Sequence, residues 1–281
     1  MKKLLITIVV ATIGVVGLAA QRQGGAPARY TPAPGAKDLR AVLFNWAWYM
    51  GMLRGAGENE SVATLELKAT GTIQVDGQPC RLTKYRISNN YQIPGERIQI
   101  ACTRADGQTY SNVEVVSGQY AWDEDIPGAE IVPGKGKATP RPNLLRERQI
   151  RLWASPQGAP KAAAAGKENT SVDWSTGKAV VTYPIPGVSG VTARATISAQ
   201  NQAEHIEVRD GNVATTFDYA KYDDFNNPLN KIEAFMPGTM VEKRNGATVR
   251  DLTTTETETG NLYVVMPVPA SVRKAATPQS N

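Results

Sequence analysis

Residues 63 to 75 alternate apolar and polar side chains. The apolar positions are Ala63, Leu65, Leu67, Ala69, Ile73 and Val75. A period of two is typical of a strand with one buried face. At 3.3 Å per residue such a strand would be about 43 Å long. Gly71 in its middle favours a bend, as in a curled sheet or barrel.

Four turn signals divide similar alternating segments farther along the chain. They are Asp76-Gly77, Asp106-Gly107, Asp210-Gly211 and Asn245-Gly246. Asp-Gly and Asn-Gly between strands predict tight hairpins, and strands joined by tight turns are antiparallel neighbours. The pattern therefore predicts a mainly β (α+β) fold, in which a curled antiparallel sheet or barrel wraps around one or two helices.

Three segments have helical character. Residues 38–54 are apolar on nearly every face, which predicts a helix buried on several sides and ended by Gly55 and Gly57. Residues 143–154 predict a helix capped by Asn143, with arginines on the side opposite its apolar residues. The alanine-rich residues 161–166 predict a further short helix. Between the first two helices, residues 124–142 predict a long loop without periodicity.

The first 20 residues have the organisation of a cleavable secretory signal peptide. Lys2 and Lys3 precede an apolar run, and small residues follow it at 17–20. The run is short for a membrane span, although an uncleaved anchor is the alternative. No cysteine lies near the cleavage site, which excludes a lipid-anchored bacterial lipoprotein. We therefore expect a periplasmic or secreted protein with no stable membrane span after cleavage.

The rest of the 281-residue chain predicts one folded domain with polar ends. Residues 21–37 are rich in Gly, Pro and Ala and predict a disordered leader. Residues 38–274 form the predicted β domain, and residues 275–281 a disordered tail. The formal charge is +5, of which two charges lie in the signal peptide. The remaining charge is small, and the chain has no run of basic residues with interleaved aromatics. Both observations argue against nucleic acid as a partner.

Cys80 and Cys102 are the two cysteines of the chain. They lie at mirrored ends of a predicted hairpin that turns near residues 89–91. An exported protein meets oxidising conditions, so we expect a disulfide, with two free buried thiols as the alternative. A redox role would favour a CxxC spacing, which is absent, so the bond is expected to be structural.

The chain offers little material for catalysis or cofactor binding. Its one histidine, His205, shares a predicted strand face with Glu207 and is interpreted as a surface residue. One histidine and two paired cysteines do not make a typical zinc or copper site. Gly134-Lys135-Gly136-Lys137 lacks the spacing of a phosphate-binding loop. We therefore expect no metal, no cofactor and no catalytic residue.

Two carboxylate clusters keep an enzyme open as an alternative. They are Asp123-Glu124-Asp125 and Asp223-Asp224. Paired carboxylates can serve a glycosidase or bind calcium, but neither cluster has the spacing of a calcium loop. Adjacent residues point apart in extended chain, so both clusters are interpreted as solvated turns.

The aromatic residues suggest a site for an apolar ligand. A curled sheet closed by helices can enclose an apolar cavity. The candidate ligand-binding residues are Phe44, Trp48, Met52, Trp122 and Trp153. The alternative is that these side chains simply fill a core, which aromatic residues often do.

The run from Val115 to Trp122 follows a hairpin containing Pro94 to Arg97. Together they resemble the periplasmic lipoprotein-carrier (LolA/LolB-like) superfamily. The stretch from Phe217 to Phe225 and the segments 241–246 and 249–253 resemble uncharacterised exported bacterial proteins. The carrier resemblance implies an incomplete antiparallel barrel around helices and a hydrophobic cavity for a lipid or a lipoprotein acyl chain. The long Pro/Gly loop and the cysteine pair depart from the carriers.

Three functions remain for the exported chain. The first is a non-catalytic protein that binds or carries a lipid or other hydrophobic ligand in a barrel cavity. The second is a structural or interaction protein of the cell envelope with a filled core. The third is an enzyme that uses Asp123, Asp125 or Asp224. The absence of a catalytic constellation favours the first two. The sequence does not determine the oligomeric state.

Overall fold

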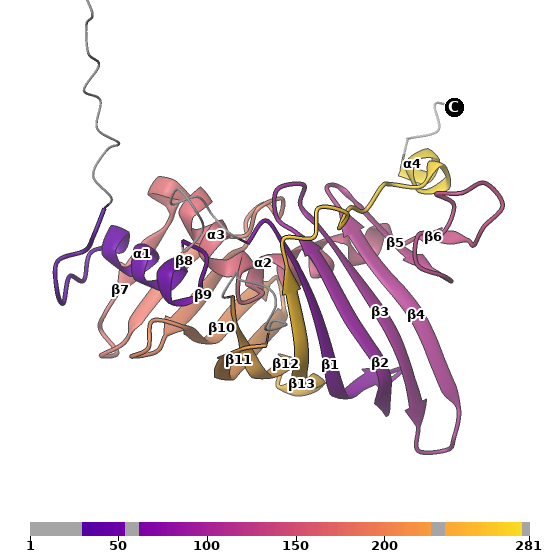
Figure 1. The fold of residues 1–281 in the computed structure, drawn as a ribbon, viewed down its shortest axis with the longest axis horizontal. Helices are drawn as coiled ribbons and strands as arrows, with labels where there is room; N and C mark the ends of the chain where they lie inside the picture. The colour runs from indigo at the N-terminus through magenta and orange to yellow at the C-terminus, as the bar shows by residue number, and fades with distance from the viewer. Residues whose placement is uncertain (1–29, 54–61, 226–233, 277–281) are drawn as a thin grey trace, which may run out of the picture. The chain divides into compact units, whose positions relative to one another are not determined.

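The fold is built on one open, mainly antiparallel sheet, seen in a computed structural model that describes residues 30–53, 62–225 and 234–276 (Figure 1). All its helices and strands lie within the unit Pro32–Asn281. The strands follow the order β6-β5-β4-β3-β2-β1-β13-β12-β11-β10-β9-β8-β7, with antiparallel neighbours throughout. This confirms the predicted fold class, with a sheet that is neither closed nor strongly curled.

The strands in the first half of the chain are β1 (Thr64–Val75), β2 (Gln78–Asn90), β3 (Gly95–Arg104), β4 (Thr109–Ser117), β5 (Tyr120–Glu124) and β6 (Ala138–Pro140). Those in the second half are β7 (Ser171–Asp173), β8 (Ala179–Pro184), β9 (Thr192–Ile197), β10 (Ala203–Asp210), β11 (Val213–Asp224), β12 (Phe235–Arg244) and β13 (Ala247–Thr259). The helices are α1 (Leu39–Tyr49), α2 (Leu145–Ala154), α3 (Gly158–Ala165) and α4 (Ala270–Ala276), with short 3-10 turns at Pro142–Leu144 and Lys167–Asn169.

The four predicted turns all join hairpins, namely β1–β2, β3–β4, β10–β11 and β12–β13. Gly71 lies at an irregularity in β1, where the pairing with β2 skips from Lys68 to Thr72. Its φ of 132° is open to glycine, and a Cβ there would lie 2.0 Å from the Asp251 carbonyl oxygen. Strand β1 is therefore irregular at the glycine where the sequence predicted a bend.

The sheet has two covered faces. The inner face packs against α1, α2 and α3 in the larger hydrophobic core, which includes Leu65, Tyr183 and Phe217. On the outer face, the segment 260–276 packs over β4, β5 and β6 through Val264, Met266 and Val272. The same segment covers the start of β1 through Asn261, which accepts a hydrogen bond from Thr64 Oγ1 and donates one to Glu66 Oε2, so residues of both alternating sets are buried there.

Two predictions about the helices were wrong in detail. Helix α1 ends at Tyr49, where Gly51 with a φ of 77° follows, rather than at the glycines beyond residue 54. Ala41, Val42 and Trp46 are buried and Tyr49 is 45% exposed, which agrees with a helix buried on several sides. Asn143 is not the cap of α2, because it lies inside the 3-10 turn that precedes this helix.

Only part of the predicted charged face of α2 faces solvent, where the side chain of Arg146 is 49% exposed. Arg148 and Arg151 are 2% and 8% exposed and point toward the sheet. The alanine-rich segment does form a helix, α3, which begins three residues earlier than predicted.

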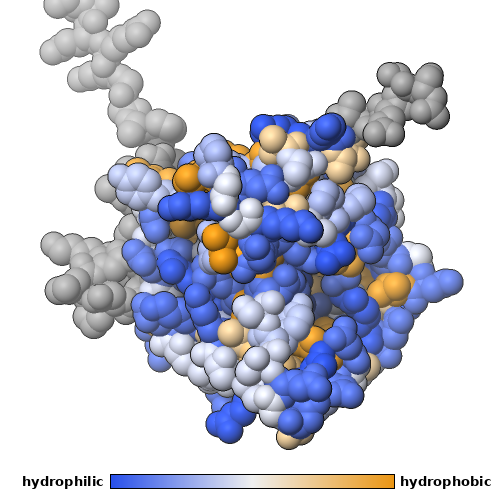
Figure 2. All heavy atoms as spheres, turned by 90° about the vertical axis from the view of Figure 1, so that its right-hand side faces the viewer, coloured by the Kyte–Doolittle hydropathy of each residue, from blue (hydrophilic) through white to orange (hydrophobic). Residues whose placement is uncertain are grey.

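The ends of the chain and the predicted loop need separate comment. The signal peptide and most of the leader lie outside the described residues. Helix α4 extends to Ala276, within the segment predicted as a disordered tail, and residues 277–281 lie outside the described range. The predicted loop 124–142 contains β6. No helix in the described ranges is long and apolar enough to cross a membrane. Viewed from the β4–β6 end, the surface is mainly hydrophilic with small separate apolar groups (Figure 2).

Candidate functional site

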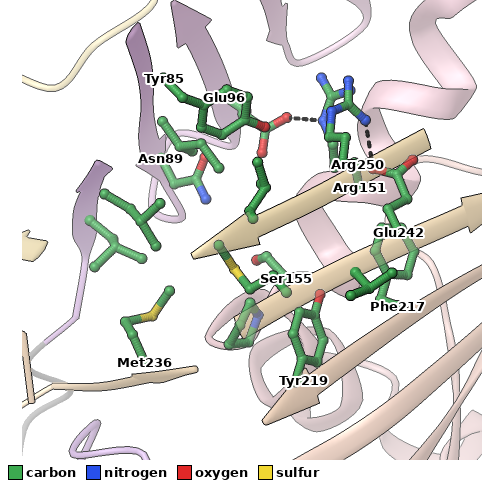
Figure 3. Close-up of a pocket in the computed structure, with 17 residues that line it drawn as sticks. Tyr85, Asn89, Glu96, Arg151, Ser155, Phe217, Tyr219, Met236, Glu242 and Arg250 are labelled. Atoms are coloured by element: carbon green, nitrogen blue, oxygen red, sulfur yellow. Dashed lines mark hydrogen bonds and ion pairs between the residues drawn. The ribbon is translucent and has the colours of Figure 1, made fainter. Parts of the chain in front are cut away.

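An apolar cavity of about 60 Å³ lies between the middle of the inner sheet face and the end of α2 (Figure 3). Alternate residues of five strands point toward it because side chains on one face of a strand recur every second position. The lining residues are Leu65, Leu67, Tyr85, Ile87, Asn89, Glu96, Arg151, Ser155, Pro156, Phe217, Tyr219, Met236, Met240, Val241, Glu242, Arg250 and Leu252.

Buried ion pairs close one end of the cavity. Arg151 Nε donates to Glu96 Oε1 at 2.7 Å, and its Nη2 lies 2.9 Å from Glu114 Oε2. Arg250 Nη1 lies 2.5 Å from Glu242 Oε2, and its Nη2 lies 3.3 Å from Glu114 Oε2. We call these five side chains the charged cluster. Because Glu114 bridges both arginines, the cluster ties α2 to β3, β4, β12 and β13.

The charged cluster holds three carboxyl groups and two guanidinium groups. If all five ionise, one negative charge is in excess. Burial raises the pKa of Glu96, and this effect outweighs the attraction of Arg151. Burial also acts to raise the pKa of Glu114, but Arg151 and Arg250 outweigh it and hold this pKa at about 2. Of Glu96 and Glu114, Glu96 is therefore the one that protonates more readily.

These opposite shifts predict opposite pH effects on stability. A lowered pKa contributes stability above the unfolded value of 4.5, and the contribution is lost as the pH falls toward 2. A raised pKa contributes stability below 4.5, and the contribution is lost as the pH rises through the folded value. We expect Glu114→Gln to lower the free energy of unfolding at pH 7 by up to about 3 kcal/mol, a deficit that shrinks on acidification. Glu96→Gln should raise the free energy of unfolding at pH 7.

Urea unfolding of both variants and the unchanged chain at pH 7, 4.5 and 3 would check this pair. Each variant is the control for the other, since both remove one carboxylate from the same cluster and keep a hydrogen-bonding amide. Equal effects of the two substitutions at pH 7 would contradict the assignment.

A neutral hydrogen-bonded chain lies at another part of the cavity wall. Asn89 Nδ2 donates to Tyr91 Oη at 3.2 Å, and Tyr91 Oη lies 3.0 Å from Ser155 Oγ. Ser155 Oγ donates to the Leu152 carbonyl oxygen at 2.6 Å. Burial raises the pKa of Tyr91 to about 12, so its hydroxyl remains protonated at neutral pH. We call Asn89, Tyr91 and Ser155 the amide end of the cavity.

None of the five ligand-binding candidates lines this cavity. Phe44 and Trp48 stack on α1 with their ring centroids 6.0 Å apart, and Met52 is buried in the larger core. Trp153 packs near Tyr91, at 6.3 Å between ring centroids, behind the amide end. Trp122 lies in the smaller core on the outer face of the sheet. Contact of any of the five with a ligand stays a prediction.

The interpretation of Asp123-Glu124-Asp125 as a solvated turn was wrong for its first two residues. They lie at the end of β5 and point to opposite faces, as expected for adjacent residues in a strand. Asp123 pairs with Arg148 at 2.5 Å and with Arg141 at 2.6 Å. Glu124 is 1% exposed and accepts hydrogen bonds from Trp122 Nε1 and the Gly128 amide. These carboxylates hold the sheet edge and its loop in place.

The other candidates for chemistry have ordinary surroundings. Cys80 and Cys102 form the predicted disulfide, with Cα atoms 5.5 Å apart. His205 is half-exposed, as predicted, and its Nδ1 lies 2.6 Å from Asp218 Oδ1. Asp224 lies at the end of β11 on the surface. Among the described residues no group of three or more His, Cys, Asp or Glu side chains could hold a metal ion.

Comparison with known proteins adds the following. No protein-family model matches the chain, and no curated protein matches it. Among solved structures, it is similar to an outer membrane lipoprotein-sorting protein domain from Vibrio parahaemolyticus, at 9% identity and a TM-score of 0.44, over 78% of this chain and 92% of that one. It is also similar to a LolA superfamily protein from Nitrosomonas europaea, at 11% identity and a TM-score of 0.44, over 81% and 96%.

The second of these structures is named for the superfamily that the sequence resembles. At these identities neither match assigns a ligand or a residue role to this chain, so its function is argued from its own cavity.

Proposed function

We propose that this chain is an exported, non-catalytic protein that binds a lipid or other hydrophobic ligand in the cavity between the sheet and α2. The observation that carries the proposal is the distribution of polarity in the cavity wall. Its middle is made of aliphatic, aromatic and methionine side chains, and its polar groups gather at the charged cluster and the amide end. Such an apolar pocket with a few polar groups is the usual form of a small-molecule site.

The size of the cavity limits what enters without movement. A volume of about 60 Å³ admits a few water molecules or a short stretch of hydrocarbon. Met236 and Met240 form part of the wall, and methionine side chains adapt easily to irregular shapes. A longer chain would therefore enter by repacking these two side chains.

The proposed export rests on two features of the sequence and the fold. The N-terminal segment has the organisation of a cleavable signal peptide. Cys80 and Cys102 are joined in a disulfide, which persists in oxidising compartments. N-terminal sequencing of the protein recovered from a bacterial periplasm tests the location, and cleavage after Ala19 or Ala20 is the expected result.

A second candidate function is favoured by the small cavity volume. A protein whose core is essentially filled would act in the envelope through its surface, as a structural or interaction protein. Native mass spectrometry after incubation with bacterial lipid extract separates the two functions. Lipid retained by the folded chain supports the first function, and a chain without lipid at every ratio supports the second.

Filling the cavity should weaken ligand binding. Leu67 is 1% exposed and lines the cavity wall, so Leu67→Phe adds atoms to the space that a ligand would use. We expect about tenfold weaker binding of an apolar fluorescent dye, equivalent to about 1.4 kcal/mol, with a stability loss below about 3 kcal/mol. The matched control is Leu82→Phe on β2, which is also buried but does not line this cavity. Equal loss of dye binding in both variants would contradict a site here.

A further inference from the structure

At the amide end of the cavity, the number of hydrogen atoms on each group determines which group donates in each hydrogen bond. Ser155 Oγ lies 2.6 Å from the Leu152 carbonyl oxygen, which accepts and cannot donate. The hydroxyl hydrogen of Ser155 is therefore used there. At its 3.0 Å contact with Tyr91, Ser155 must accept, so the Tyr91 hydroxyl donates to it.

The same reasoning continues to Asn89. Since Tyr91 uses its one hydrogen on Ser155, its oxygen must accept at the 3.2 Å contact with Asn89. The side-chain amide of Asn89 therefore presents its Nδ2 to Tyr91. This orientation follows from the chain of donors and not from the assignment of the amide atoms.

These hydrogen bonds leave the side-chain oxygen of Asn89 without a donor. Asn89 is 2% exposed, and its Oδ1 has no hydrogen-bond partner among the residues that the structure describes. An unpaired buried acceptor is costly, and most such groups in folded proteins find a partner. Because Asn89 lines the cavity, a bound molecule can supply that partner (Figure 3).

We propose that the cavity takes a neutral amphiphile with a hydrogen-bond donor, a hydroxyl or an amide N–H, which binds Asn89 Oδ1 while its hydrocarbon part lies along Leu65, Leu67 and Phe217. This inference rests on the proposed function and specifies its ligand. An anionic head group is disfavoured at Asn89 Oδ1, because an ionised carboxylate only accepts hydrogen bonds and has no hydrogen to donate to this oxygen.

The test compares octanol, octyl methyl ether and octanoate as competitors of a neutral naphthylamine dye bound to the full chain. The ether has the same alkyl chain as octanol but only accepts hydrogen bonds. We expect octanol to bind about tenfold more tightly than the ether, and octanoate more weakly than octanol.

Two variants assign the preference to Asn89. Asn89→Leu keeps the number and branching of the side-chain heavy atoms and removes the unpaired acceptor, so the variant should fold and bind octanol and the ether equally. Met240→Leu changes the apolar wall of the same cavity and should shift both affinities together, which keeps their ratio. Thermal unfolding of each variant checks that it is folded.

The outcomes separate this inference from the function on which it rests. If no octyl compound displaces the dye from the unchanged chain, the proposed function is wrong. If octanol and ether bind equally to the unchanged chain, or Asn89→Leu keeps the preference for octanol, the cavity binds ligands but Asn89 does not select them. If the ether or octanoate binds more tightly than octanol, the class of ligand is wrong.

Discussion

Arg151→Met should lower the free energy of unfolding by about 3–5 kcal/mol, the usual cost of removing one partner from a buried ion pair. Arg151 contacts Glu96 at 2.7 Å and Glu114 at 2.9 Å, and its side chain is 9% exposed. Without it, the carboxyl groups of the charged cluster keep Arg250 as their one cation within the cluster. Urea unfolding at pH 7, followed by circular dichroism, measures the loss.

Arg146→Met on the same helix is the matched control. Arg146 also makes an ion pair, with Asp210 at 2.7 Å, but its side chain is 49% exposed. An exposed pair of this kind contributes at most about 1 kcal/mol. If both variants lost a similar free energy of unfolding, burial would not be the reason why the charged cluster stabilises the fold.

Breaking the disulfide should cost about 3 kcal/mol. Cys80 and Cys102 are 22 positions apart, and in the chain-entropy description a loop of that length loses about this much stability when the crosslink is absent. The double variant Cys80→Ala/Cys102→Ala removes the bond and also leaves small voids, since both residues are buried. Its urea-unfolding midpoint should fall accordingly.

Reduced protein of unchanged sequence separates the crosslink from the voids. It lacks the bond but keeps both sulfur atoms in the core, so its stability should lie between those of the double variant and the oxidised chain. An unfolding midpoint that does not respond to reduction would show that the crosslink contributes no stability.

The sheet was predictable because its determinants are local. Alternation from Ala63 to Val75 defines a strand face by itself, and Asp76-Gly77 defines the turn that follows. The disulfide followed from the next hairpin, β2–β3, although its turn lies at residues 91–94 and Cys102 pairs in register with Leu82. Small errors in a turn position shift a register without changing which strands are neighbours.

The charged cluster could not be predicted in the same way. Arg148 and Arg151 lie on a helix side that also carries other charges, which is the usual pattern of a solvent-facing surface. Their burial depends on Glu96, Glu114 and Asp123, which come from three different strands. Only the register of the assembled sheet brings these carboxylates under α2.

The lining of this cavity could not be predicted for a related reason. The prediction weighted tryptophan and the apolar N-terminal helix, whereas the lining comes mainly from alternate residues of five strands around the middle of the sheet. Trp122 shows the difficulty most clearly, since its neighbour Asp123 points to the inner face and the indole therefore points to the outer one. One signal was available in hindsight, because Leu65, Leu67, Phe217 and Tyr219 share the inward phase of their strands.

The two ends of the sheet have a consequence for association between copies of the chain. The order of strands terminates in β6 and β7, each of only three residues. Pro140 in β6 has no amide hydrogen to offer to an incoming strand, and α4 packs beside this edge while α1 packs beside β7. Because both edge strands are short and lie beside a helix, the sheet offers few free backbone groups on which strands of another copy could pair and a fibril could grow.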